Sequence, residues 1–271
     1  MNTILLPKTP KIVNKKDNWA QFEIESLYPG YGITIGNSLR RALLSSLAGA
    51  AVTQMKIKGV QHEFSTISGV LEDVLTIAMN LKKLRFKMYT DEPQKAFLKI
   101  KGEKEVKGSD LELPSQVELA NPSSYIATIT NNKTELEMEI QIEKGMGYEP
   151  VEERKRKGKL EIGTIPIDAI FSPIERVGYK VENMRVGERT DFDRLFLDIK
   201  TDGTITPEEA FSKASEILAE HFSLLSTAFI SKEEKVKKEE KESENLKEKE
   251  IKKVKKEQKK KKVNKVNKKK K

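Results

Sequence analysis

The chain has 271 residues, of which 37% are hydrophobic and 34% are charged, and its formal net charge is +9. It contains no cysteine, which excludes disulfides, thiolate metal sites and cysteine nucleophiles. The sequence has no apolar run of about 18 residues and no N-terminal signal-peptide pattern, so we expect a cytoplasmic protein without a membrane span.

The positive charge is concentrated at the C-terminal end. Residues 232–271 hold 20 lysines and nine glutamates, a net charge of +11, whereas residues 1–231 hold 31 basic and 33 acidic side chains. Within this tail, residues 252–271 carry 13 lysines and one glutamate, or +12. We expect the tail to be disordered. It either keeps the protein in solution or binds nucleic-acid phosphates without sequence preference.

A strand and a helix are predicted near the N-terminus. Residues 19–28 alternate apolar and polar side chains, as a half-buried strand does, and a Pro-Gly turn follows. Apolar residues then recur at helical spacing over residues 37–48. Asn37 or Ser38 is the expected N-cap of this helix, and Gly49 is its expected stop.

Two adjacent arginines, Arg40 and Arg41, lie beside the apolar face of this helix. They are either part of a solvated helix surface or cations that meet a partner. Arginine suits the second role because its planar guanidinium binds carboxylates or carbonyls through two hydrogen bonds.

The next part of the chain is predicted to be rich in strands. Residues 52–60 alternate again, and a second helix is expected from a cap at Ser68 as far as Leu81. Short alternating runs separated by turn residues over 83–150 predict an antiparallel β region. Residues 152–159 are predicted to form a charged loop.

The body ends in a long amphipathic helix. Strand patterns resume over residues 160–170 and 195–199. Thr206 and Glu209 then have the spacing of a capping box, which predicts a helix over 207–229 with one apolar stripe.

The two amphipathic helices lie at opposite ends of the body, with the β-rich segment between them. The simplest topology places both chain ends in one domain and inserts the middle as a second domain. The apolar helix faces either cover their own sheet or extend into contact with another subunit.

The sequence lacks a convincing catalytic or cofactor site. The glycines at 30, 32 and 36 do not have the spacing of a dinucleotide-binding loop, and turn formation explains them better. His62 and His221 are the only histidines, and structural roles suit both of them. No nucleophile elbow is present.

Two long stretches resemble one family. The run GYGITIGNSLRRALLSSLAGAAVTQMKIKGVQHEFSTISGVLEDVLTIAMNLKKL, residues 30–84, is similar to the amino-terminal domain of bacterial RNA polymerase alpha subunits. So is GKLEIGTIPIDAIFSPIERVGYKVENMRVGERTDFDRLFLDIKTDGTITPEEAFSKASEILAEHF, residues 158–222. The match favours a bacterial origin over a plastid one.

The resemblance implies an α+β fold with two domains. Residues 1–50 and 176–230 would form a discontinuous dimerisation domain, and residues 51–175 would form an inserted β-rich domain. The low-complexity Lys/Glu tail, 231–271, would follow.

The resemblance also implies a homodimer whose two protomers hold the β and β′ subunits of a DNA-directed RNA polymerase. The implied dimer interface comprises Leu39, Leu43, Ile217, Leu218 and Leu224. The implied β-subunit contacts are Arg40, Arg41, Leu44, His62 and Glu63, with Phe64, Ser65 and Thr66 beside them. The implied β′-subunit contacts are Ser172, Pro173, Glu175, Arg176, Val177 and Arg189, and Lys82 is a further large-subunit contact.

Such a chain would assemble the enzyme and have no active site of its own. No cofactor is expected on it, and the catalytic magnesium is expected on β′. Omega and sigma are further expected partners in the holoenzyme, and DNA is reached through the assembled enzyme.

The sequence departs from the family pattern in two places. Met146 replaces the arginine of a Lys-Gly-Arg-Gly-Tyr turn at residues 144–148, so a contact made by that arginine is not expected here. The residues after the body are too few and too polar for the family's helical carboxy-terminal domain, so we expect no specific recognition of upstream DNA. The alternative function is a stand-alone nucleic-acid-binding dimer with a basic tail.

Overall fold

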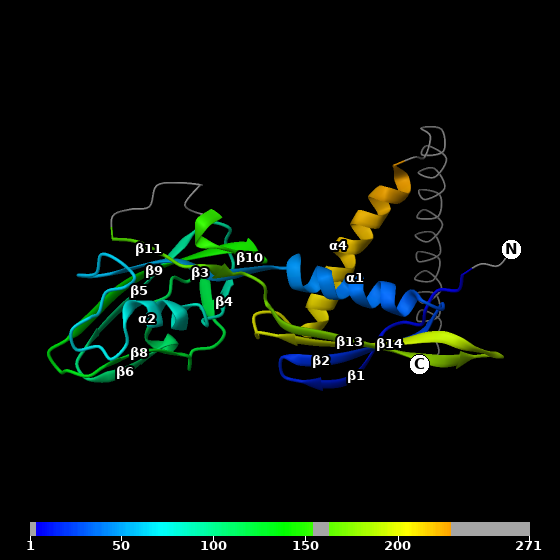
Figure 1. The fold of residues 1–271 in the computed structure, drawn as a ribbon, viewed down its shortest axis with the longest axis horizontal. Helices are drawn as coiled ribbons and strands as arrows, with labels where there is room; N and C mark the ends of the chain where they lie inside the picture. Colours follow the sequence, from blue (N-terminus) through cyan, green and yellow to red (C-terminus); the bar gives the residue numbers. More distant parts are fainter. Residues whose placement is uncertain (1–3, 154–162, 229–271) are drawn as a thin grey trace, which may run out of the picture. The chain divides into compact units, whose positions relative to one another are not determined.

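A computed structural model describes residues 4–153 and 163–228 of the chain (Figure 1). Internal contacts divide the chain into a body of residues 1–218 and a second part that begins at Ala219. The predicted charged loop lies largely, and the tail entirely, outside the described residues.

A four-stranded antiparallel sheet is built from both ends of the body. Its strands are β1 (Lys11–Lys16), β2 (Trp19–Leu27), β14 (Arg189–Thr201) and β13 (Ile174–Val186), in that order. Leu197 of β14 lies between Phe22 of β2 and Tyr179 of β13. Strand β13 has no clean alternation of buried and exposed residues, which is why the sequence pattern did not reveal it.

A second sheet is built from the middle of the chain. Its order is β5 (Gln94–Lys101), β9 (Glu135–Met146), β3 (Ala48–Ile57), β4 (Phe86–Met88) and β7 (Val117–Leu119), and β11 (Ile165–Pro166) also pairs with β3. This arrangement confirms the predicted antiparallel β region.

Smaller elements complete this part of the chain. Strand β6 (Lys104–Lys107) pairs with β8 (Tyr125–Ile129), and β10 (Tyr148–Glu149) pairs with β12 (Ala169–Ile170). A single 3₁₀ turn, η1, covers Gly108–Asp110. Helix α2 (Val74–Leu81) packs on the inner face of the second sheet, where Ile77 and Leu81 are fully buried among residues of β3, β5 and β9.

Helix α1 (Tyr31–Ser45) begins six residues before the predicted start, and the expected caps Asn37 and Ser38 lie inside it. Its N-cap is Gly30, whose φ of 84° is in the left-handed region that glycine adopts without strain. The first two turns contain Gly32 and Gly36 because they lie close to the sheet. A Cβ on Gly36 would be 2.9 Å from Tyr179 Cδ2 and 3.0 Å from Leu195 Cδ1.

The predicted cap of the second helix was also wrong. Helix α2 begins after Asp73, whose Oδ1 accepts a hydrogen bond from the Thr76 N–H at 2.8 Å. Ser68 instead precedes a turn at Gly69, where φ is 78°. An aspartate is as good an N-cap as a serine, so periodicity alone could not choose between them.

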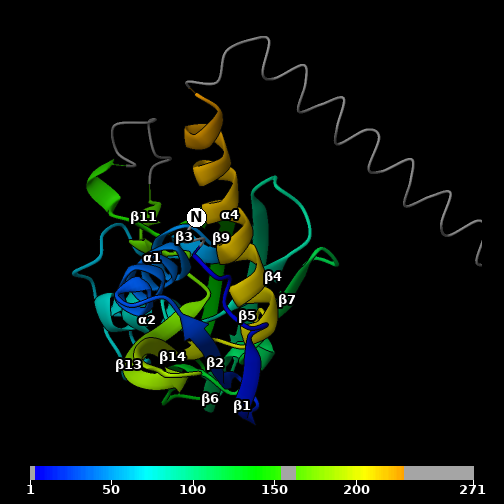
Figure 2. The same ribbon diagram turned by 90° about the vertical axis from the view of Figure 1, so that its right-hand side faces the viewer.

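Helix α4 (Pro207–Thr227) has the predicted capping box. The Glu209 N–H donates to Thr206 Oγ1 at 3.3 Å, and the Thr206 N–H donates to Glu209 Oε2 at 3.4 Å. The ring of Phe211, in the first half of the helix, stacks on Phe22 of β2. Helix α1 packs on β13 and β14, so the same sheet supports both helices (Figure 2).

Candidate functional site

The outward face of α1 carries cations that the rest of the described chain leaves free. Arg40, Arg41 and Leu44 are all exposed on this helix. Across residues 4–153 and 163–228, neither guanidinium forms an ion pair or a side-chain hydrogen bond. Two unpaired arginines beside an exposed leucine form a surface that can bind a carboxylate-bearing partner.

The structure corrects two residues that were assigned to the dimer interface. Leu43 is 0% exposed and Leu39 is 5% exposed, and both belong to the core between α1 and the four-stranded sheet. They therefore stabilise their own chain and have no surface to offer to a second copy. The apolar stripe of α1 therefore covers its own sheet. The sequence had left two interpretations open, packing on this sheet or contact with another subunit.

The apolar stripe of α4 differs from that of α1. Ile217 and Leu218 are only partly buried against the core of the four-stranded sheet. Beyond residue 218, Leu224 is 70% exposed, and Phe222 and Leu225 are exposed as well. Large apolar side chains thus remain accessible along one helix, as in surfaces that bind another protein.

The loop after β3 presents the other residues assigned to β. His62 is exposed, and one of its ring nitrogens, Nδ1, lies 3.1 Å from Ser65 Oγ. Glu63 is half-buried, whereas Phe64 is 76% exposed. The histidine has a local partner, and the phenylalanine is the most exposed apolar side chain of the loop.

The segment that enters β13 divides into buried and exposed residues. Pro173 and Val177 are buried, and Val177 lies in the core beneath α1 and α4, so these two assignments to β′ are corrected. Ser172 is half-buried, and Glu175 and Arg176 are exposed. Along this strand the residues that face the core cannot also face a partner.

Arg189, the remaining β′ candidate, is held firmly in place. Its Nε and Nη2 donate to the two carboxylate oxygens of Asp191, at 3.0 and 2.6 Å. Its guanidinium carbon lies 5.1 Å from the ring centre of Phe192 and 5.6 Å from that of Tyr28. The Arg189 hydrogen bond lowers the pKa of Asp191 and raises the pKa of the arginine.

Lys82, the further large-subunit candidate, follows α2 and pairs with Asp168 between β11 and β12. The Nζ–Oδ2 distance is 3.0 Å. The pKa of Asp168 is lowered first by the hydrogen bond from the Val151 N–H to its carboxylate, and then by Lys82. This ion pair restrains the lysine, so a partner that contacts Lys82 would find its ammonium group already paired with Asp168.

A residue that the sequence reasoning missed is Asp193 of β14, which is buried under the start of α1. Its Oδ2 accepts hydrogen bonds from the N–H groups of Gly30 and Gly32, at 2.9 and 3.0 Å. The sequence did contain a signal for its burial. Asp193 is separated by even numbers of positions from Leu195, Leu197 and Ile199, which are buried on β14. The carboxylate fills the anion-binding position at the N-terminus of α1, and its close approach explains the glycine at position 32.

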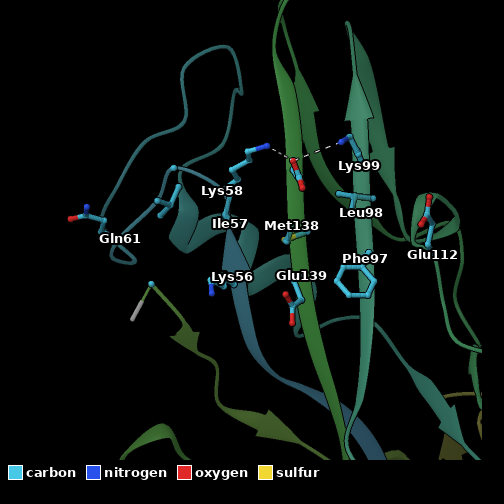
Figure 3. Close-up of a pocket in the computed structure, with 14 residues that line it drawn as sticks. Lys56, Ile57, Lys58, Gln61, Phe97, Leu98, Lys99, Glu112, Met138 and Glu139 are labelled. Atoms are coloured by element: carbon cyan, nitrogen blue, oxygen red, sulfur yellow. Dashed lines mark hydrogen bonds and ion pairs between the residues drawn. The ribbon is translucent and has the colours of Figure 1, made fainter. Parts of the chain in front are cut away.

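An open groove of about 780 Å³ lies on the outer face of the second sheet (Figure 3). Lys58 Nζ lies 2.7 Å from Glu137 Oε2, and Lys99 approaches the same carboxylate from β5. Phe97 is exposed beside Glu139 in this groove. Alternating lysines and glutamates compensate one another here, so the groove has no strong charge of either sign.

Among the described residues, no group of three or more histidine, aspartate or glutamate side chains is placed to hold a metal ion. Within the same part of the chain, no helix has the length and apolar character needed to span a membrane.

The sequence has many relatives of one kind. Residues 55–172 match the family model described as the RNA polymerase Rpb3/RpoA insert domain. A DNA-directed RNA polymerase subunit alpha from Roseiflexus castenholzii is 48% identical over 233 residues, which is 84% of this chain and 71% of that protein. Proteins of the same name from Aquifex aeolicus and Oceanobacillus iheyensis are 46% and 49% identical, over 86% and 79% of this chain and 73% and 69% of theirs.

The resemblance noted in the sequence is therefore confirmed over the body of the chain, and the strand-rich fold agrees with it. This chain belongs to the family of DNA-directed RNA polymerase alpha subunits.

Proposed function

We propose that this chain is the assembly platform of a bacterial DNA-directed RNA polymerase, as a homodimer that recruits the β and β′ subunits in the cytoplasm. In this proposal it supplies no catalytic group, and the catalytic magnesium is held by β′. Omega, sigma and DNA are met within the assembled enzyme.

The observation that carries the proposal is the outward face of α1. Arg40 and Arg41 are exposed and lack ion-pair partners in the described parts of the chain, and Leu44 lies beside them. We assign the β contact to these three residues of α1, together with His62 and Glu63 of the loop after β3. We assign the β′ contact to Ser172, Glu175, Arg176 and Arg189, without the buried Pro173 and Val177.

For the dimer we propose the stripe of α4 in place of the buried leucines of α1. Leu218, Phe222 and Leu225 have the i, i+4, i+7 spacing of one helix face, and Ile217 and Leu224 flank them. A two-fold axis would let this stripe pack on its own copy. For the domains we propose residues 1–50 and 176–230 as the dimerisation domain and residues 51–175 as the insert, although β3 of the second sheet already begins at Ala48 and β13 of the four-stranded sheet at Ile174.

The test is co-purification of the large subunits with the tagged, full-length chain. Arg41→Ala should weaken capture of β about tenfold and leave the dimer intact, since its guanidinium forms no ion pair or hydrogen bond with the described residues. Arg176→Ala should reduce capture of β′ while β is retained. Arg185→Ala is the control, because Arg185 is an exposed arginine that is not among the assigned contacts and whose Nε donates to the Gly187 carbonyl of its own hairpin.

The alternative, a free nucleic-acid-binding dimer, is favoured by one feature, the +12 charge of residues 252–271. The same purification distinguishes the two functions. Recovery of nucleic acid without β or β′ would favour the alternative, and recovery of both large subunits in stoichiometric amounts would favour the polymerase platform.

A further inference from the structure

The N-terminal turn of α1 has no capping group of its own. Its N-cap is Gly30, which has no side chain, and the first turn contains no acidic residue. The first N–H groups of a helix have no partner within the helix and need an acceptor from elsewhere. They also carry the positive end of the helix dipole, so a carboxylate is the acceptor that they bind best.

Asp193 supplies that acceptor from a different element. Its Oδ2 receives the N–H groups of both Gly30 and Gly32, and the residue is 7% exposed. The contact is also a steric fit. A Cβ on Gly32 would lie 3.0 Å from Asp193 Cβ and 2.7 Å from Val181 Cγ1, so only glycine allows the helix to approach this closely.

The sheet is shaped around this contact. The pairing of β14 with β2 shifts register between Asp193 and Leu195, as it does at a β-bulge. On the β2 side, Ser26 has a φ of 63°, and its N–H lies 3.1 Å from the sulfur of Met184. A non-glycine residue in the left-handed region is uncommon and persists where surrounding contacts hold it.

We propose that Asp193 is a positioning residue for partner binding by α1. It fixes the axial height and rotation of the helix on β13 and β14, and so directs Arg40, Arg41 and Leu44 to the β subunit. The inference rests on the proposed function for the identity of the partner. Arg41 follows Gly32 by about 14 Å along the helix axis. A small tilt of the helix at its first turn therefore displaces the guanidinium groups of Arg40 and Arg41.

The experiment compares Asp193→Ala with Asp193→Asn in the full-length chain. Asparagine keeps a side-chain oxygen in the same place and caps helices well, whereas alanine leaves both N–H groups without an acceptor. Hydrogen exchange of the α1 amides is measured first on the chain alone. Exchange in the first turn should accelerate about tenfold in the alanine variant, and the asparagine variant should recover most of the protection.

Capture of β is then measured on the same samples. Asp193→Ala should weaken it about tenfold while the dimer is retained, and Asp193→Asn should restore it. The control is Asp198→Ala on the same strand, because Asp198 is half-buried and its carboxylate accepts from Gln21 rather than from α1.

The outcomes separate this inference from the proposed function. Unchanged exchange in the first turn of Asp193→Ala would overturn the positioning role. Faster exchange with undiminished capture of β would show that helix placement does not govern partner binding, and would overturn it as well. Failure of the unmodified chain to capture β would instead contradict the proposed function, while the exchange measurement would still report on the contact.

Discussion

Arg85 and Asp202 form an ion pair between the segment that leads into β4 and the turn that follows β14, with 3.8 Å between Nε and Oδ2. The carboxylate is 6% exposed and also accepts the N–H and hydroxyl of Thr204. The Arg85 N–H donates to Asn121 Oδ1 at 2.8 Å, which holds the arginine's backbone in place. This pair therefore connects the two sheets through residues that local sequence patterns do not single out.

Arg85→Ala should destabilise the chain by about 1–3 kcal/mol near neutral pH, because it leaves a buried carboxylate without its cation. Burial raises the pKa of Asp202, and Arg85 opposes that rise. The carboxyl group of Asp202 therefore binds its proton more tightly in the native state than in the unfolded chain. As the pH rises through the folded pKa, Asp202 loses this proton and its contribution to the free energy of unfolding is lost.

The cost of Arg85→Ala should accordingly shrink as the pH falls, because a protonated Asp202 no longer needs a cation. Urea unfolding of variant and parent at about pH 7 and about pH 4 measures this difference. An equal cost at both values would show that the pair acts through packing and not through charge.

Leu218→Glu should favour monomers, since it places a carboxylate in the proposed stripe of α4. Sedimentation of the full-length chain at micromolar concentration measures the mass. Lys213→Glu, at an exposed position of the same helix, reverses a charge outside the stripe and should leave the mass of the dimer unchanged. A dimeric Leu218→Glu variant would move the interface away from α4.

Gly36→Ala should destabilise the chain by about 1–3 kcal/mol despite the better helix propensity of alanine. The new Cβ would be 2.9 Å from Tyr179 and 3.0 Å from Leu195, and the buried leucine has little room to move. Asn37→Ala is the matched control at an exposed position of α1 and should stabilise by about 0.5 kcal/mol. Thermal unfolding compares the two variants. Stabilisation by both substitutions would show that Tyr179 and Leu195 of the sheet shift to make room for the new Cβ.

Removal of residues 232–271 should lower the salt dependence of promoter-complex formation by the assembled enzyme. If the lysines of 252–271 neutralise phosphates, each such contact contributes about 0.9 to the slope of log K against log salt. The assay compares enzyme containing the full-length chain with enzyme containing residues 1–231. Equal slopes would identify the tail as a solubilising segment that does not bind DNA.

Where local signals were strong, they predicted the structure correctly. Alternation revealed β2 and the strands of the second sheet, and the spacing of Thr206 and Glu209 revealed the start of α4, because side-chain periodicity and capping are properties of neighbouring residues. The start of α1 was missed because glycines lower helix propensity, and close packing on β13 and β14 overrides that preference here.

The same division applies to the candidate surfaces. The sequence by itself determined the family, the strand-rich fold and the pair of arginines on α1, since these depend on residue identities and their spacing. Only the tertiary structure decided that Leu39, Leu43, Pro173 and Val177 are buried, and that Asp193 caps a helix from a distant strand. Burial and long-range hydrogen bonds depend on which segments the fold brings together, and no local pattern encodes that choice.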